Sequence, residues 1–382
     1  MASRRGVLKL IGGGVVLAAV AGGGWYVANG PSGASRAAWK EAGTPKEKRR
    51  RFLSYALLAP NPHNRQPWLV DLAGEDELVL YCDLDRRLPE TDPFDRQIVI
   101  GCGAFLELLS IAAASEGYRA DITPFPKGEP APTLDARPIA HVRLVADSAS
   151  RDAAFDYILK RQTNRNDYEE RGVEADIRSK LELAGSLPGF KLGTTGEGEL
   201  AAKLRDLTWR AHEREMLTHR TLKESVDLMR IGNAEIEKYR DGISLDGQMI
   251  AFASLTGMIS RESMLDPKSD AFKMGMDQYR RMAASARSFA WLTGPPGRPA
   301  EIAAGRAYAR FALKAAELDL AVHPWSQSLQ EFAEMRPLYE EVNALLGGGE
   351  SVHMLVRIGY AAPDVTAPRR GLAALIRETG QG

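Results

Sequence analysis

The stretch GCGAFLELLSIAAASEG, residues 101–117, is apolar on almost every side of a helix. A helix without a polar face belongs in the core of a domain rather than on its surface. The stretch GRAYARFALKAAELDL, residues 305–320, aligns with residues 103–118 at an offset of 202 positions (305 − 103), and both have an Ala-rich centre. We therefore expect a long buried helix in each half of the chain.

A strand-like segment repeats in the same order. VHMLVRIGY, residues 352–360, resembles AHVRLVAD, residues 140–147, at an offset of 212 positions (353 − 141). Two resemblances in one order at nearly equal offsets favour a duplicated unit, although Ala-rich helices also resemble one another by chance. The sequence therefore predicts an internal duplication.

Composition excludes several classes of protein. The 382 residues are 44% hydrophobic, enough for one large domain or two medium ones, and 50 basic side chains balance 50 acidic ones. A net charge of zero gives no field that would attract nucleic acid, so we expect no nucleic-acid partner. Cys82 and Cys102 form no CxxC pair and cluster with no histidines, so we expect no metal site. In an oxidising compartment a disulfide between them is the alternative interpretation. Two independent buried thiols are the favoured interpretation.

The first thirty residues read as an export signal. Arg4 and Arg5 precede Val-Leu-Lys and a Gly-rich apolar run that ends near Ala28. This order is similar to the twin-arginine signal, which sends folded proteins through the twin-arginine export machinery. A membrane anchor is the alternative, since residues 10–28 approach the length of a bilayer span. Six glycines in this run favour the signal, so we expect a periplasmic protein or one tethered to the outer face of the inner membrane.

The remaining chain divides by pattern into a linker and two halves, and the second half carries an insert. Residues 31–46 look like a linker, and residues 47–150 form the first half, with strands at 69–72, 78–81 and 141–145 and a helix over 46–58. Residues 151–382 form the second half. A long, charged, Met-rich insert at about 212–290 predicts extra helices, as a cover over a site or as a plain helical excursion.

The segment APNPHNRQPW, residues 59–68, joins the first helix to the first strand. Three prolines (60, 62 and 67) fix φ and remove backbone donors, so the segment is stiff before a ligand arrives. Asn61, Asn64 and Gln66 each offer an amide that both donates and accepts hydrogen bonds. An Asx-turn entering a strand is the simpler explanation, but six such residues in ten favour a binding site for a flat polar ligand.

This segment resembles the Ala-Pro-Ser-x-x-Asn-x-Gln-Pro-Trp motif of the FMN-dependent nitroreductase family, with Asn61 in place of the usual serine. The run RQTNR, residues 161–165, resembles the segment with which that family grips the FMN phosphate. Two arginines that flank a hydroxyl also suit a phosphate physically, whereas a solvated basic helix start is the ordinary alternative. The resemblance assigns this role to Arg161, Thr163 and Arg165.

Two further segments resemble the family near the C-terminus. Arg369 and Arg370, after Pro368, match the basic residues that follow the terminal strand and reach the phosphate. HPWSQ, residues 323–327, lies where the family has a loop close to the reactive flavin nitrogen. The resemblance thus implies a cofactor site that also includes Pro62, His63, Pro324, Trp325, Ser326 and Gln327. His63 and His323 are candidate proton donors, although a loop histidine is more often a bystander.

The motifs are divided between the halves. The amide-rich loop occurs in the first half only, and the phosphate-binding arginines occur in the second half only. The resemblance therefore implies an α+β fold of tandem nitroreductase-like α/β sandwich lobes, which form an intramolecular pseudo-dimer with one FMN per chain. This double-length arrangement behind a twin-arginine signal resembles the Acg-like branch of the superfamily. A fused pair favours a monomer.

The family resemblance implies an oxidoreductase. FMN would carry electrons from a small-molecule donor, a reduced nicotinamide, to a quinone, nitro group or similar acceptor. Free NAD(P)H is not expected outside the cytoplasmic membrane. This leaves a flavin-binding or flavin-sequestering protein without catalysis, or a flavin-degrading relative, as alternatives.

Overall fold

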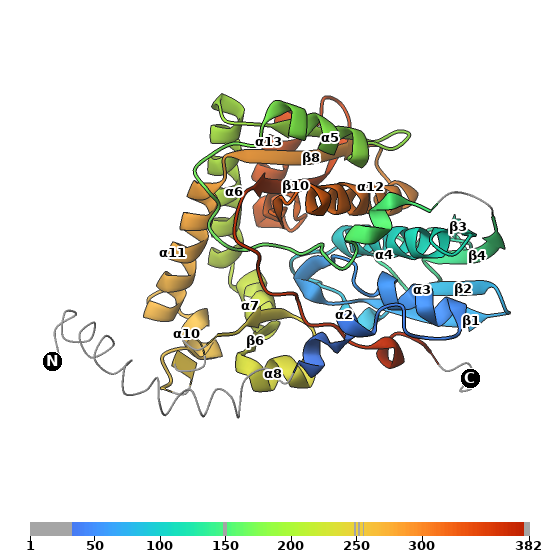
Figure 1. Ribbon diagram of the computed structural model, residues 1–382. Coiled ribbons are helices and arrows are strands. Elements are labelled where there is room, and N and C mark those ends of the chain that lie inside the picture. Colours follow the sequence, from blue (N-terminus) through green and yellow to red (C-terminus); the bar gives the residue numbers. More distant parts are fainter. Residues whose placement is uncertain (1–32, 148–150, 248–249, 251–252, 255, 378–382) are drawn as a thin grey trace.

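The computed structural model describes residues 33–147, 151–247, 250, 253–254 and 256–377 (Figure 1). The predicted export signal at residues 1–30 therefore lies outside the described residues. Helices and strands are mixed throughout, which confirms the predicted combination of helix and sheet.

The first half is a four-stranded antiparallel sheet with two helices. Its strands follow the spatial order β1-β2-β4-β3, and helix α3 packs against the long helix α4. The strands predicted at 69–72, 78–81 and 141–145 correspond to β1, β2 and β4. The elements are α3 (Lys48–Ala56), β1 (Trp68–Ala73), β2 (Glu77–Cys82), α4 (Arg96–Ala114), β3 (Tyr118–Pro124) and β4 (Ala140–Ala146).

The second half has the same succession of elements, with an insertion. Its sheet follows the order β5-β8-β10-β9, and α5 packs against the long helix α12 as α3 packs against α4. An additional helix, α13, lies between β9 and β10. The elements are α5 (Ala175–Gly185), β5 (Lys191–Thr195), β8 (Ser288–Gly294), α12 (Arg298–Glu317), β9 (Ala321–Pro324), α13 (Arg336–Leu346) and β10 (Ser351–Gly359).

The insert lies between the paired strands β5 and β8, where the first half has only a short turn at Gly74. It begins at Glu199, earlier than the predicted residue 212, because α6 starts there, and its helices occupy the left of Figure 1. Its elements are α6 (Glu199–Leu217), α7 (His219–Asp227), β6 (Met229–Ile231), α8 (Gly232–Tyr239), β7 (Ile243–Leu245), α10 (Arg261–Leu265) and α11 (Asp270–Ser285). Short 3-10 turns are η1 (Ala34–Arg36), η2 (Pro62–Asn64), η3 (Leu84–Arg86), η4 (Ala153–Tyr157), η5 (Gln327–Leu329), η6 (Ala333–Met335) and η7 (Leu372–Ala374).

Helices α4 and α12 lie against each other at the centre of the molecule (Figure 1). They touch at Gly103 and Gly305, the first residues of the two stretches aligned above. A Cβ at Gly103 would overlap the carbonyl oxygen of Ile302 and lie 3.0 Å from the Cα of Gly305. A Cβ at Gly305 would overlap the carbonyl oxygen of Ile100. Only glycine at both positions lets the two backbones approach this closely.

Two arginines at the starts of these helices reach into the opposite half. Arg96, the first residue of α4, forms an ion pair with Glu331 at 3.0 Å and donates to the carbonyl oxygen of Leu329. Arg298, the first residue of α12, donates to the carbonyl oxygens of Phe94 at 2.6 Å and of Pro132 at 2.8 Å. Arg96 and Arg298 stand 202 positions apart, as Gly103 and Gly305 do.

A buried carboxylate adds a charged contact between the two central helices. Glu107 of α4 is fully buried and forms ion pairs with Arg306 at 2.6 Å and Arg310 at 2.5 Å, both on α12. Removing one partner of a buried ion pair leaves an uncompensated charge, so this contact also fixes the relative position of the helices.

Helix α4 is the core element of the first half. Among the described residues it is the one helix long and apolar enough to cross a membrane, and it is mostly buried inside the protein. Its composition is therefore that of a core helix. Cys82 and Cys102 pack in the same core as free, buried thiols, which confirms the favoured interpretation over a disulfide.

The segment predicted as a linker contains two short helical elements. Helix α2 (Ala37–Glu41) follows η1, and their side chains anchor to distant elements. The Ser35 hydroxyl donates to Glu237 at 2.9 Å, Arg36 pairs with Asp246 at 2.7 Å, and the Trp39 indole donates to the Ala367 carbonyl oxygen at 2.8 Å. The linker prediction for residues 31–46 was therefore wrong over 34–41, where short helices make these contacts.

The C-terminal segment crosses from the second half to the first (dark red in Figure 1). After β10 it passes the amide-rich loop and reaches the edge strand β1. There the Val70 amide donates to the Leu375 carbonyl oxygen at 2.9 Å, and the Arg377 amide donates to the Val70 carbonyl oxygen at 2.9 Å. The end of the second half thus extends the sheet of the first.

Replacing Gly103 by Ala tests the helix contact. We expect Gly103→Ala to lower the free energy of unfolding by roughly 3 kcal/mol or more, because the helices must separate to admit the methyl group. Gly275→Ala is the matched control: it lies inside α11 with nothing within 4 Å of the added Cβ, and alanine favours helix there by up to about 1 kcal/mol. Urea unfolding followed by tryptophan fluorescence measures both. Equal effects of the two substitutions would refute the close contact.

Candidate functional site

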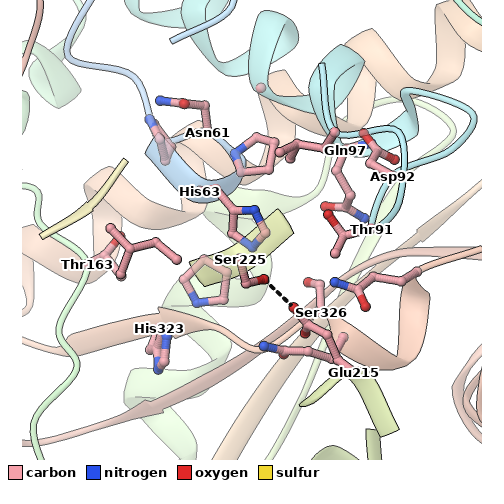
Figure 2. Close-up of a pocket in the computed structure, with 18 of the residues that line it drawn as sticks. Asn61, His63, Thr91, Asp92, Gln97, Thr163, Glu215, Ser225, His323 and Ser326 are labelled. Carbon is pink, nitrogen blue, oxygen red and sulfur yellow. Dashed lines mark hydrogen bonds between the residues drawn. The ribbon is translucent and has the colours of Figure 1, made fainter. Parts of the chain in front are cut away.

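A cavity lies where the two halves and the insert meet. Its free space is about 1220 Å³, open mouth included. Figure 2 shows side chains from both halves around it. Its walls are the loop after α3, the start of α4, the segment after η4, α12, the loop after β9 and helices α6, α7 and α11 of the insert. Residues far apart in the sequence therefore converge on one cavity.

The loop of residues 59–68 forms one wall and is held in an unusual backbone conformation. His63, Asn64 and Gln66 have φ values of 46°, 51° and 50°. Three non-glycine residues in the left-handed region carry strain that persists only where surrounding contacts impose it, often at functional sites. The Asn61 side chain supplies two such contacts: its Oδ1 accepts from the Gln66 amide at 2.7 Å, and its Nδ2 donates to the Ala59 carbonyl oxygen at 3.1 Å.

Of the predicted loop residues, Asn61, Pro62 and His63 line the cavity, whereas Asn64 and Gln66 do not. Gln66 is fully buried, and its Oε1 accepts from the Arg370 amide at 2.8 Å. Asn64 donates through Nδ2 to the Pro368 carbonyl oxygen at 3.0 Å, and its Oδ1 accepts from Arg369. These two amides hold the crossing C-terminal segment against the loop.

Arg161 and Arg369 meet at the carbonyl oxygen of Leu58. Their guanidinium groups donate to it at 3.1 Å and 3.2 Å, and the side chains are only 4% and 3% exposed. In the described part of the chain neither forms an ion pair, and the Nε of each is buried without a hydrogen-bond partner. Burial, with the charge of Arg161, lowers the pKa of Arg369 to about 9.

Two buried arginines without a carboxylate form an anion-binding arrangement. They do not line the cavity directly. Tyr308 does line it, and its phenol interacts electrostatically with Arg161. The arginines therefore lie in the wall behind the cavity, at the junction of the two halves.

Thr163 and Arg165 line the cavity, and Arg370 does not. The Arg165 amide donates to Asp364 at 2.9 Å, and its guanidinium is exposed. Arg370 turns toward Asp83, 3.7 Å away, and donates to the Ala374 carbonyl oxygen at 3.1 Å. The structure thus separates the guanidinium groups of Arg369 and Arg370.

The loop after β9 contributes Pro324, Ser326 and Gln327 to the cavity, whereas Trp325 lies behind it. Trp325 is 1% exposed, and its amide donates to the Leu355 carbonyl oxygen at 2.8 Å. Its ring packs edge to face on Tyr279 of α11, with centroids 6.1 Å apart. Trp325 therefore supports this wall rather than facing a ligand.

His323 lines the cavity and is oriented by a buried arginine. Arg357 of β10 donates from Nε to Nδ1 of His323 at 3.1 Å, which places the imidazole proton on Nε2. Arg357 also donates to the carbonyl oxygens of Met282 and Asn166, both at 2.9 Å. Burial and the nearby Arg357 charge hold the pKa of His323 well below its usual range, so the ring is a neutral donor.

His63, on the opposite wall, is also neutral near pH 7. Burial, together with the charges of Arg165 and Arg65, lowers its pKa to about 4. At neutral pH both imidazole rings are therefore uncharged, and each carries a single N–H proton.

The insert supplies a wall that the motifs did not predict. His212 of α6 and Tyr279 of α11 stack with centroids 4.0 Å apart and planes 16° apart, and both line the cavity. The signal in the sequence was a polar pair, His212 and Glu215, on the face of α6 that otherwise carries Leu204 and Ala211. This spacing puts both side chains on the buried side of the helix.

Acidic and amide side chains form another part of the cavity, also missed from the sequence. Asp92 accepts from the amides of Gln97 at 3.0 Å and Ile98 at 2.9 Å, at the start of α4. Glu215 accepts from the Ser225 hydroxyl at 3.1 Å, the contact drawn dashed in Figure 2. Burial raises the pKa of each carboxyl to about 7. Among the described residues no group of three or more His, Cys, Asp or Glu side chains is arranged to hold a metal.

Sequence comparison relates the chain to mycobacterial proteins. No protein-family model matches it. The NAD(P)H nitroreductase acg of Mycobacterium tuberculosis is 33% identical over 130 residues, 33% of this chain and 38% of that protein. The uncharacterized protein Rv3127 of the same organism is 37% identical over 116 residues, 29% of this chain and 32% of that protein. The chain thus matches about a third of the length of these relatives.

Solved structures resemble the chain more distantly. The FMN-dependent nitroreductase NfnB from Mycobacterium smegmatis, in complex with NADPH, is 20% identical at a TM-score of 0.36, over 59% of this chain and 98% of that one. A nitroreductase with bound FMN from Bacteroides fragilis is 14% identical at a TM-score of 0.31, over 57% and 94%. The sequence match to a relative named as an NAD(P)H nitroreductase agrees, over about a third of its length, with the resemblance of the motifs.

Replacing Glu215 by Gln tests the burial of this carboxyl. Its pKa is about 7 in the folded protein against 4.5 in the free side chain, so the folded state binds the proton more tightly. The stability from this proton is complete below about pH 4.5 and lost as pH rises through 7. The unfolding free energy of Glu215→Gln minus that of the wild type should therefore rise between about pH 5 and pH 7.5, by on the order of 3 kcal/mol.

Thermal unfolding across this pH range measures the difference. Glu213→Gln, on the same helix but outside the cavity lining, is the control and should give a difference that does not change with pH. A flat profile for Glu215→Gln would contradict the burial of an uncompensated carboxyl.

Proposed function

We propose that the chain binds one FMN at the junction of its halves and acts as an oxidoreductase through it. The observation that carries the proposal is the pair Arg161 and Arg369, buried without carboxylate partners and joined through Leu58 to the strained loop. An FMN phosphate would supply the acceptors that the unpaired Nε atoms lack. The cavity beside them is lined by side chains from both halves and from the insert.

The side chains around the cavity fit the remaining groups of FMN. Asn61, Thr163 and Ser326 offer donors and acceptors for the mixed polar edge of a flavin and for ribityl hydroxyls. His212, which is buried, and Tyr279 cover one side with a stacked ring pair. His323 holds a proton on Nε2, oriented by Arg357. FMN, when bound, supplies the electron-carrying chemistry.

We also propose that the two halves are diverged copies that form an intramolecular pseudo-dimer. Three observations support this: the same succession of elements, the same strand order in both sheets, and equivalent residues at a single offset. The last are Gly103 and Gly305, which touch, and Arg96 and Arg298, each of which reaches into the opposite half. Each copy then keeps the part of the site that the other lacks. A monomer with one site follows from this arrangement.

The proposed partners are a small-molecule electron donor and a quinone, nitro or similar acceptor. The name of the relative acg points to NAD(P)H as the donor to test first. We also propose export by the twin-arginine route, supported by Arg4, Arg5 and the apolar run that follows. Export would place the protein where free NAD(P)H is not expected, so a different donor would then be needed.

A flavin-binding protein without turnover is the second candidate. It is favoured by the insert, since α6, α7 and α11 all contribute side chains to the cavity and restrict the space for a second substrate. The two candidates share the FMN site and differ in whether the bound flavin exchanges electrons.

Loss of the Arg369 charge should weaken the grip on the phosphate. We expect Arg369→Met to bind FMN at least about 10-fold more weakly, because one charge-assisted hydrogen-bonding partner is lost, and to bind riboflavin as the wild type does. Arg171→Met, an exposed arginine that pairs with Glu169, is the control and should not change either affinity. Quenching of flavin fluorescence measures both ligands. Equal losses for FMN and riboflavin would contradict the phosphate assignment.

Stopped-flow spectroscopy separates the two candidate functions. The FMN-loaded protein is mixed with NADH, NADPH or dithionite without oxygen, then with a nitroaromatic or quinone acceptor. The oxidoreductase proposal predicts bleaching by at least one physiological donor and rapid recovery of the flavin absorbance with an acceptor. Bleaching by dithionite alone, with no recovery beyond that of free FMN, would favour the binding protein.

A further inference from the structure

One end of the cavity has buried acceptor oxygens without a hydrogen-bond partner among the described residues. Glu215 Oε2, Gln327 Oε1 and Gln330 Oε1 are buried without a hydrogen-bond partner, and all three residues line the cavity. They come from α6 of the insert and from η5 and the residue after it. We call Glu215, Gln327 and Gln330 the acceptor cluster. A buried oxygen without a partner costs free energy, so such a group marks a place where a ligand can supply the donor.

Carboxyl groups gather around this cluster. Glu215 is 2% exposed and forms no ion pair within the described residues, although the amides of Gln327 and Gln330 lie close enough to lower its pKa. Asp92 lines the same part of the cavity, and Glu224 lies near enough to raise the pKa of Glu215. Three nitrogens of the cavity lining are also buried without a partner among the described residues: Nε2 of Gln97, Nδ1 of His63 and Nδ1 of His212.

This end lies apart from the arginine side of the cavity. Figure 2 shows Asp92, Thr91 and Glu215 on one side of His63, and Thr163 and His323 on the other. An anionic cofactor is attracted to the side with Arg165 and, behind it, Arg161 and Arg369. The acceptor cluster is therefore left for a second ligand.

Glu215 can ionise here at little cost when a cation is present. Its pKa of about 7 means that the protonated and ionised forms are nearly equal in free energy at neutral pH. A positive group within hydrogen-bond reach favours the carboxylate. A carboxylate ligand would instead meet the carboxyl groups of Glu215 and Asp92 and the amide oxygens of Gln327 and Gln330.

We propose that the acceptor cluster binds the positively charged, donor-rich group of a second ligand, an alkylammonium or amidinium, through Glu215, Gln327 and Gln330. The inference rests on the proposed function for the same cavity, in which FMN takes the arginine side. It names the substrate class: an electron acceptor, or a ligand that competes with it, that carries a cationic nitrogen group and not a carboxylate.

Calorimetry with two flat probes of similar size tests the proposal without turnover. Benzamidine carries an amidinium, and benzoate carries a carboxylate in the same place on the ring. The FMN-loaded wild type should bind benzamidine at least about 10-fold more tightly than benzoate, since a charged hydrogen-bonded pair contributes at this level. Glu215→Gln should lose about 10-fold in benzamidine affinity with benzoate unchanged or improved.

Glu213→Gln is the matched control, because it removes the same charge from the same helix outside the cavity lining. It should leave both affinities as they are. Benzoate binding as tightly as benzamidine to the wild type would overturn the inference, and this measurement needs no variant. Equal benzamidine affinity of Glu215→Gln and wild type would overturn it as well.

The flavin spectrum of the same samples separates this inference from the proposed function. Retained FMN with no preference for benzamidine refutes the acceptor cluster and leaves the FMN site standing. Failure of the wild type to retain FMN refutes the proposed function itself. Benzamidine binding can then still be measured on the flavin-free chain.

Discussion

The contact between Gly103 and Gly305 determines how the rest of the molecule is arranged. Because neither residue has a Cβ, α4 and α12 pack backbone against backbone at the centre. Glu107, Arg96 and Arg298 then fix the helices by charge and hydrogen bonds that cross from one half to the other. The two sheets are positioned by this helix pair, and the cavity lies where the halves and the insert meet.

The candidate cofactor site also depends on the way in which the contact between α4 and α12 positions the two halves. Leu58 lies at the end of the first helix of one half, and Arg161 and Arg369 come from the segments before and after the sheet of the other. They converge because the C-terminal segment crosses to β1 and is held there by Gln66 and backbone hydrogen bonds. Neither half alone contains both the strained loop and the arginines.

The sequence predicted what depends on local pattern and missed what depends on long-range packing. Apolar continuity predicted α4, alternation predicted β1 and β2, and the alignment of 103 with 305 found the two residues that touch. Motif resemblance found Thr163 and Arg165 in the cavity. The resemblance could not separate Arg369 from Arg370, because the contact with Leu58 directs the first side chain and Asp83 directs the second. It also missed Glu215, which reaches the cavity only because the insert folds back.

The central claim is that one chain contains one complete site, built from both halves. Native mass spectrometry of the purified chain under conditions that keep FMN bound tests this most directly, because it reads subunit number and flavin number on the same ion. The account predicts a monomer of about 41.8 kDa that carries a single FMN. A chain that carries flavin only as a dimer, or a monomer that carries two, would contradict it.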